Sequence, residues 1–219
     1  MPDATSPVAA RWIQRWLIVI GLMVYAMILI GGATRLTDSG LSITEWAPLK
    51  GALPPLSEAA WLSEFEKYQA TAEFQQQNYN MTMSEFQFIY WWEWGHRLFG
   101  RLIGLVAIGG FIWFAAMRWL SKKWAARLGV LIALGGLQGF IGWWMVASGI
   151  GETDRLAVAP YRLMTHFCLA LLIIAITAWF WLDLGERERS PMTGPLRWLA
   201  IAILGLTSFQ MMSGALVAG

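Results

Sequence analysis

Five long runs of apolar residues, nearly free of charge, dominate the chain. They are Trp16–Ala33, Leu102–Met117, Leu128–Ala147, Leu163–Leu182 and Trp198–Gly219. A helix needs about 20 mostly apolar residues to cross the hydrocarbon core of a bilayer. Each run approaches that length once its flanking residues are added. The pattern therefore predicts an all-α integral membrane protein with five transmembrane helices.

The longest polar stretch, residues 34–90, lies between the first two runs. Its first part is rich in Gly, Pro, Ser and Thr and ends at Pro54–Pro55, which predicts irregular structure. The part that begins at Ser57 predicts an amphipathic helix against the outer face of the bundle or membrane, continuing to Phe74. Its apolar residues recur at helical spacing: Trp61, Leu62, Phe65 and Tyr68. Ser84 is a candidate N-cap for the helix of the second span.

A faint internal repeat marks the first, third and fifth apolar runs. The third run has Gln138 four residues before Gly142, the fifth has Gln210 four residues before Gly214, and the first ends with Gly31 and its neighbours. Repeats of this kind indicate tandem units, here helical hairpins. Glycines in membrane helices also commonly serve only close packing. We expect two hairpins to form a four-helix bundle over residues 16–183, and residues 198–219 to begin a second bundle of a larger molecule.

Composition and charge agree with a membrane protein and suggest its topology. Hydrophobic residues make up 57% of the chain and charged residues 14%, and the net charge of +2 is too small to indicate nucleic-acid binding. Basic residues cluster before the first run and in the links after the second and fourth runs. By the positive-inside rule, residues 1–15 and the linker 184–197 are cytoplasmic. A multi-pass protein in the lipid of a bacterial plasma membrane is the simplest location.

The chain has only two histidines, His96 and His166. Each lies within a turn or two of the predicted outer boundary, on the second helix of its hairpin. Two imidazoles at one depth in a helical bundle suit the axial ligands of a haem iron. Alternatively, either histidine hydrogen-bonds a neighbouring helix. The single cysteine, Cys168, excludes a disulfide within the chain and a cysteine-built metal cage.

Charged residues accompany the histidines at the same level. Arg97, Arg101 and Arg162 can pair with haem propionates through bidentate hydrogen bonds, or extend to lipid headgroups. Glu93 shares a helix face with His96 and can form an ion pair with Arg97 four residues later. It can equally stabilise positive charge or accept a proton at the edge of a porphyrin. Glu93 is therefore the residue that distinguishes an enzyme from an electron carrier.

Three segments together resemble the haem A synthases of proteobacteria and mitochondria. They are the Glu-x-x-His motif of Glu93–His96 with the block RLFGR that follows it, the segment GGATRLTDSGLSITEWAPLKGALPP from Gly31 to Pro55, and the helix of His166. The Glu-x-x-His motif alone is weak, but its combination with the Gly31–Pro55 segment is specific. The resemblance runs from about Arg15 to the end of the sequence.

The resemblance implies an eight-span oxidoreductase of two similar four-helix halves, of which these residues hold the first half and one more helix. Such an enzyme oxidises a methyl group of haem O to a formyl group by successive hydroxylations, giving haem A for cytochrome oxidase. The resemblance assigns the iron of the substrate haem to His96 and His166 and a catalytic role to Glu93. A haem b belongs to a second histidine pair, which these residues lack. We therefore expect these residues alone to be inactive.

The resemblance also names partners, while other functions stay open. By analogy, partners are haem O synthase and cytochrome oxidase assembly factors; a homo-oligomer is compatible with the sequence. Some family members carry paired cysteines in the first outer loop, and none is present here, so no redox role transfers. The main alternative is a bis-histidine membrane cytochrome b that only carries electrons. A haem-free transporter or assembly subunit is the third hypothesis.

Overall fold

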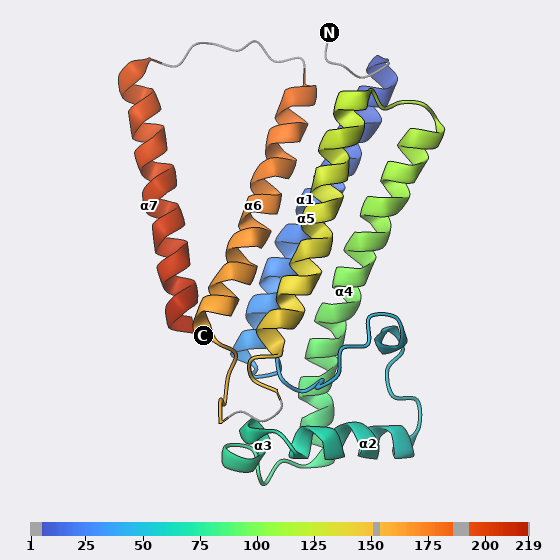
Figure 1. Ribbon diagram of the computed structural model, residues 1–219, viewed down its shortest axis with the longest axis vertical. Helices are drawn as coiled ribbons and strands as arrows, with labels where there is room; N and C mark the ends of the chain where they lie inside the picture. Colours follow the sequence, from blue (N-terminus) through green and yellow to red (C-terminus); the bar gives the residue numbers. More distant parts are fainter. Residues whose placement is uncertain (1–5, 151–153, 186–192, 219) are drawn as a thin grey trace.

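The computed structural model describes residues 6–150, 154–185 and 193–218 (Figure 1). Within these residues, the regular secondary structure is helical and there is no strand. Five of the helices are long and apolar enough to cross a membrane. They are α1 (Pro7–Leu36), α4 (Met83–Ala116), α5 (Lys122–Val146), α6 (Pro160–Leu184) and α7 (Gly194–Ala218). The predicted all-α membrane fold is confirmed. Half of the predicted linker 184–197, including Arg187 and Arg189, lies outside the described residues, and its last four residues, 194–197, belong to α7.

Four of the long helices form one bundle. Helix α1 packs against α4 and α6, and α5 packs against the same two helices, while α7 packs against α6. The core contains Ile13 and Leu17 of α1, Leu128 of α5 and Ile173 of α6. Figure 1 shows α2 and α3 at one end of the bundle and the link between α4 and α5 at the opposite end. The C-terminal end of α7 approaches the N-terminal end of α6, and no residue of α7 is buried.

The helices extend well beyond the apolar runs that predicted them. Helix α1 begins at Pro7 rather than near residue 16, because Ser6 accepts a hydrogen bond from the backbone N–H of Ala9 as an N-cap. Proline at the first helical position favours the same start. Hydropathy marks the part of a helix that lies in lipid, whereas capping residues decide where the helix begins. The predicted N-terminal segment 1–15 is therefore largely helical in its described part.

The N-cap of α4 is Thr82, so the predicted cap at Ser84 is wrong. The side chain of Thr82 accepts from the N–H of Glu85, and the Glu85 carboxylate accepts from the N–H of Thr82 at 2.7 Å. This reciprocal pair is a capping box. A carboxylate in the first turn also interacts favourably with the helix dipole. Ser84 has a glutamine at the matching position, which carries no charge.

The outer segment between α1 and α4 contains two short helices and a 3-10 turn. Helix α2 (Glu58–Gln69) starts after Ser57, as predicted, but the predicted continuation to Phe74 is wrong. The chain breaks and restarts at Thr71, which caps α3 (Ala72–Gln76). The 3-10 turn η1 (Lys50–Ala52) lies in the irregular part. The aromatic face of α2 packs on the outer end of α4, where Phe86 stacks on Tyr68 at 5.4 Å between ring centroids.

Candidate functional site

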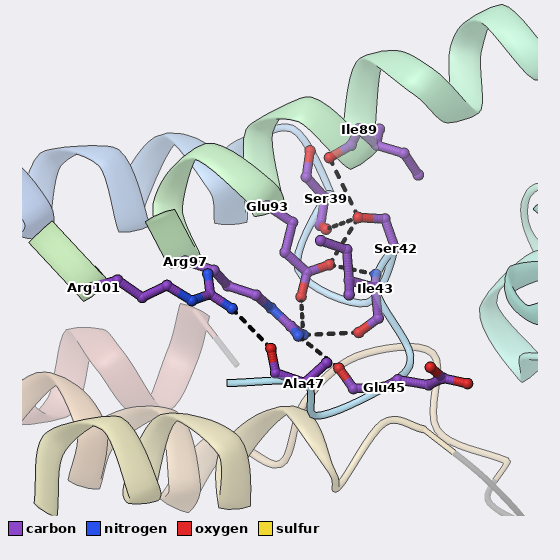
Figure 2. A network of polar contacts seen from close by, with 9 residues as sticks. All are labelled: Ser39, Ser42, Ile43, Glu45, Ala47, Ile89, Glu93, Arg97 and Arg101. Carbon is purple, nitrogen blue, oxygen red and sulfur yellow. Dashed lines mark hydrogen bonds and ion pairs between the residues drawn. The ribbon is translucent and has the colours of Figure 1, made fainter. Parts of the chain in front are cut away.

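The centre of the site is Glu93, a buried carboxylate on α4. Only 2% of its surface is exposed. Its Oε2 atom lies 2.7 Å from both the hydroxyl of Ser42 and the backbone nitrogen of Ile43, and its Oε1 atom pairs with Arg97 (Figure 2). The ion pair that the spacing predicted is therefore present. The two contacts with Ser42 and Ile43 bind the outer segment to α4, and no local sequence pattern predicted them.

Two arginines of α4 fix the irregular segment that follows α1. We call residues 39–48 the outer strap. Arg97 donates to the carbonyl oxygens of Ile43 at 2.8 Å and Glu45 at 3.0 Å. Arg101 donates to the carbonyls of Ala47 at 3.1 Å and Pro48 at 2.9 Å (Figure 2 draws the Ala47 bond). These bonds satisfy backbone acceptors that no regular structure pairs. The Nη1 atom of Arg101 is buried without a partner in the described part of the chain.

The two histidines occupy matching positions in the two hairpins. The ring of His96 on α4 lies over Gly31 of α1, where an added Cβ would be 3.4 Å from Nε2. The ring of His166 on α6 lies over Gly142 of α5, where an added Cβ would be 2.8 Å from Cε1. Each hairpin thus presents one imidazole beside a glycine of its partner helix.

Gln138 contacts His166 and was not selected as a site residue from the sequence. Its Nε2 atom lies 3.2 Å from Nδ1 of His166 and 3.0 Å from the His166 carbonyl oxygen. Its Oε1 atom is buried with no partner among the described residues. The sequence held a signal, because Gln138 stands four residues before Gly142 in the internal repeat. The repeat did not say which side chain of α6 the amide would meet.

Arg162 lies apart from the other predicted site residues. It donates to the carbonyl of Trp144 at 2.7 Å, and its guanidinium carbon is 4.6 Å from the centre of the Trp144 ring. It also contacts the hydroxyl of Tyr161. The structure therefore brings Glu93, Arg97 and Arg101 together with the outer strap. Arg162, in the first turn of α6, instead binds the last turn of α5 through Trp144.

A second buried carboxyl, Glu73 on α3, was also missed. It is 3% exposed, and its Oε2 atom has no partner in the described chain. Burial raises its pKa to about 8, and the charges of Asp38 and Glu93 act in the same direction. Burial likewise raises the pKa of Tyr68 on α2. Glu73 is thus mainly protonated at neutral pH. The negative charge of Glu93 contributes to the raised pKa. Glu73 differs from the exposed glutamates of this segment only in its burial, and no sequence pattern predicted that burial.

The arrangement suits a porphyrin better than a bare metal ion. The described residues contain no cluster of three or more His, Cys, Asp or Glu side chains that could hold a metal. Two imidazoles are the usual axial set of a haem, in which the porphyrin itself supplies the other four nitrogen ligands. The ring of His96 makes no hydrogen bond with the described part of the chain, so its nitrogens are available to a ligand.

Fold and site together define a class of protein: a multi-pass helical membrane protein with one histidine in each of two helical hairpins and a buried carboxylate on the helix of the first histidine. The chain belongs to the COX15-CtaA family, described as cytochrome oxidase assembly protein, whose model matches residues 14–219. This finding confirms the family that the sequence motifs indicated.

Proteins named as haem A synthases are similar to the chain over nearly its whole length. A protein of Hyphomonas neptunium named "Heme A synthase" is 67% identical over 218 residues, covering 100% of this chain and 62% of its own length. A "Heme A synthase" of Maricaulis maris is 51% identical over 214 residues, covering 98% and 62%. The chain thus spans about three fifths of the length of these relatives. No solved structure matches it.

Proposed function

We propose that this chain is part of a haem A synthase and that its four-helix bundle holds the substrate haem. In the proposed reaction a methyl group of haem O is oxidised to a formyl group through successive hydroxylations, which gives haem A. The support comes from two sources. The relatives carry the name "Heme A synthase", and the pair of imidazoles over Gly31 and Gly142 suits a haem.

The matched imidazoles are the observation on which the proposal depends. His96 and His166 come from facing hairpins and lie over glycines, so no side chain of α1 or α5 stands between the ring and the helix it faces. In this proposal both imidazoles bind the iron of haem O. Gln138 then orients His166, because a hydrogen bond to one ring nitrogen fixes the direction of the other.

Arg97, Arg101 and Arg162 are the proposed partners of the haem propionates. Arg101 supports this role best, since its buried Nη1 donor has no partner among the described residues and a propionate oxygen would satisfy it. A guanidinium has five N–H donors, so Arg97 can keep its bonds to the outer strap and still bind an anion. Arg162 uses Nη1 and Nε for Trp144 and Tyr161 and keeps further donors.

Glu93 is the proposed catalytic carboxylate. Ser42, the backbone of Ile43 and Arg97 hold it in one position before any substrate binds. A fixed negative charge stabilises positive charge that develops as the methyl carbon loses electrons, without a cost of reorganisation during the reaction. Its second possible task is to accept a proton from the reacting group. Both tasks require a carboxylate, and neither is needed by a protein that only carries electrons.

The test compares Glu93→Gln with Glu66→Gln, a surface control on α2, in the full-length protein. Haems are extracted from purified protein and identified by mass. We expect Glu93→Gln to keep bound haem O and to lose most haem A, while Glu66→Gln behaves as wild type. Undiminished haem A formation in Glu93→Gln would remove Glu93 from the mechanism. A bis-histidine electron carrier would instead yield haem b in all three proteins, with no haem O and no hydroxylated intermediate.

Topology and partners complete the proposal. The basic links predict a cytoplasmic N-terminus and a site near the outer face of a bacterial plasma membrane. A haem b bound by the rest of the full-length protein would relay electrons. Haem O synthase and cytochrome oxidase assembly factors are the proposed partners, in line with the description of the family as cytochrome oxidase assembly proteins.

A further inference from the structure

Three leucines in the loop around η1 are almost fully exposed. We call residues 49–56 the leucine loop. The exposed fractions are 87% for Leu49, 71% for Leu53 and 81% for Leu56. Single exposed leucines are common on protein surfaces, but a cluster of three in eight residues marks a surface that another apolar phase covers. The loop continues directly from the outer strap, which contacts the candidate site.

The depth of the leucine loop follows from its contacts with α4. Arg101 donates to Pro48, and Gly51 lies so close to Arg101 that an added Cβ would be 3.0 Å from Nη2. The neighbouring Gly100 packs against Met27 of α1, with 3.4 Å from an added Cβ to the Met27 methyl carbon. Met27 lies six residues inside Ala33, the outer end of the apolar run, or about 9 Å along the helix. The loop therefore contacts α4 at a level below the outer end of the apolar run of α1.

The loop is continuous with the lipid-facing surface of α4. Leu102 and Leu105, in the turn that follows Arg101, are 42% and 68% exposed. Figure 1 shows the loop beside α4, on the side away from α7 and between the bundle and α2. The one charged residue of the loop, Lys50, is exposed and has a side chain long enough to place its ammonium group among lipid headgroups. Apolar tips with a cationic flank are typical of segments that lie in a membrane interface.

We propose that Leu49, Leu53 and Leu56 insert between the acyl chains of the outer leaflet. The inference rests on the membrane-spanning bundle and does not depend on the proposed function. The lipid then holds one end of the outer strap, while Glu93, Arg97 and Arg101 hold the other. The position of the strap over the site is thereby linked to the bilayer surface.

The test measures the depth of a nitroxide spin label at Leu53→Cys. The background is full-length protein with Cys168→Ser, reconstituted in phospholipid nanodiscs. Leu105→Cys is the lipid-facing reference, and Glu66→Cys, at an exposed charged position of α2, is the water-facing reference. Collision rates with oxygen, which concentrates in acyl chains, and with a water-soluble nickel chelate are compared. We expect the oxygen-to-nickel ratio at Leu53 to equal that at Leu105 and to exceed that at position 66 several-fold.

Two results would overturn the proposal. A ratio at Leu53 equal to that at position 66 would place the loop in water. Low collision rates with both reagents would mean that protein covers the leucines, from another part of the full-length chain or from a second copy. Leu49→Cys and Leu56→Cys give independent readings if the label at Leu53 prevents folding, and agreement with Leu105 at both positions supports insertion.

Discussion

The two hairpins of the bundle hold their histidines in the same way but surround them differently. His96 lies over Gly31 and His166 over Gly142. Beside His96 are the buried Glu93, two arginines and the outer strap. Beside His166 is the neutral amide of Gln138, while Arg162 binds a carbonyl and an aromatic ring. The scaffold is therefore repeated and the charge is not. In the proposed function, the first hairpin supplies the catalytic carboxylate and the second mainly supplies a ligand to the haem.

Removing either imidazole should have the largest effect on haem binding. In full-length protein, His96→Ala and His166→Ala should each abolish stable binding of the substrate haem, because both hairpins supply one proposed ligand. Absorbance of the bound haem in purified protein measures this. Glu66→Gln, at an exposed position of α2, is the control. If only one of the two histidine variants loses the haem, the hairpins are not equivalent in holding the iron.

The next prediction compares the loss of stability when an arginine is removed from the charged hairpin or from the neutral one. Arg97→Gln leaves Glu93 buried beside an uncharged partner, which should cost about 3–5 kcal/mol. Arg162→Gln removes a hydrogen bond to Trp144 and a cation–π contact, at about 1–2 kcal/mol. Limited proteolysis of the outer strap and thermal denaturation in nanodiscs measure the two changes. Equal losses in both variants would contradict the difference between the hairpins.

Replacing the glycine behind each imidazole by alanine should have a smaller effect, which depends on how closely the ring approaches that glycine. Gly142→Ala places a Cβ 2.8 Å from the ring of His166, so the ring or α5 must shift, at about 1–3 kcal/mol. Gly31→Ala places a Cβ 3.4 Å from His96, which is nearly ordinary contact. Haem affinity should therefore fall clearly more in Gly142→Ala. Gly139→Ala, where an added Cβ meets nothing within 4 Å, is the matched control.

A further effect concerns the buried Glu73 near the charged hairpin. Folded Glu73 keeps its proton up to about pH 8, whereas the unfolded chain releases it above the ordinary value of 4.5. Its contribution to stability is full below pH 4.5, falls as the pH rises from 4.5 to 8, and is constant above 8. The slope is at most about 1.4 kcal/mol per pH unit. Glu73→Gln should remove this slope from melting temperatures measured between pH 6 and 8, while Glu66→Gln should keep it.

The features of the fold and site that could be predicted depend on sequence patterns within a single helix. Long charge-free runs predicted the spans because lipid excludes charge along a whole helix. The ion pair of Glu93 with Arg97 followed from a spacing of four residues on one helix. The cap at Ser84 was predicted wrongly, because Thr82 and Ser84 both fit the pattern and only the charge of Glu85 favours Thr82.

The parts that could not be predicted join distant segments through irregular backbone. Ser42 and Ile43 are about 50 residues from Glu93, and the outer strap that carries them has no period from which a register follows. Glu73 is buried because α3 turns away from the line of α2 at Thr71, a break that the helical pattern did not show. The contact of Gln138 with His166 depends on how α5 and α6 rotate against each other.

By itself, the sequence determined the membrane class, the number of candidate spans, the family and the assignment of the two histidines to different spanning helices. Each of these depends on hydropathy, on spacing within one helix or on a motif, all of which act along the chain. Tertiary structure alone decided what surrounds those histidines: a glycine behind each ring, a carboxylate fixed by the outer strap on one side, and an amide on the other. Helix rotation and the path of an irregular loop set these contacts, and both depend on the packing of the whole bundle.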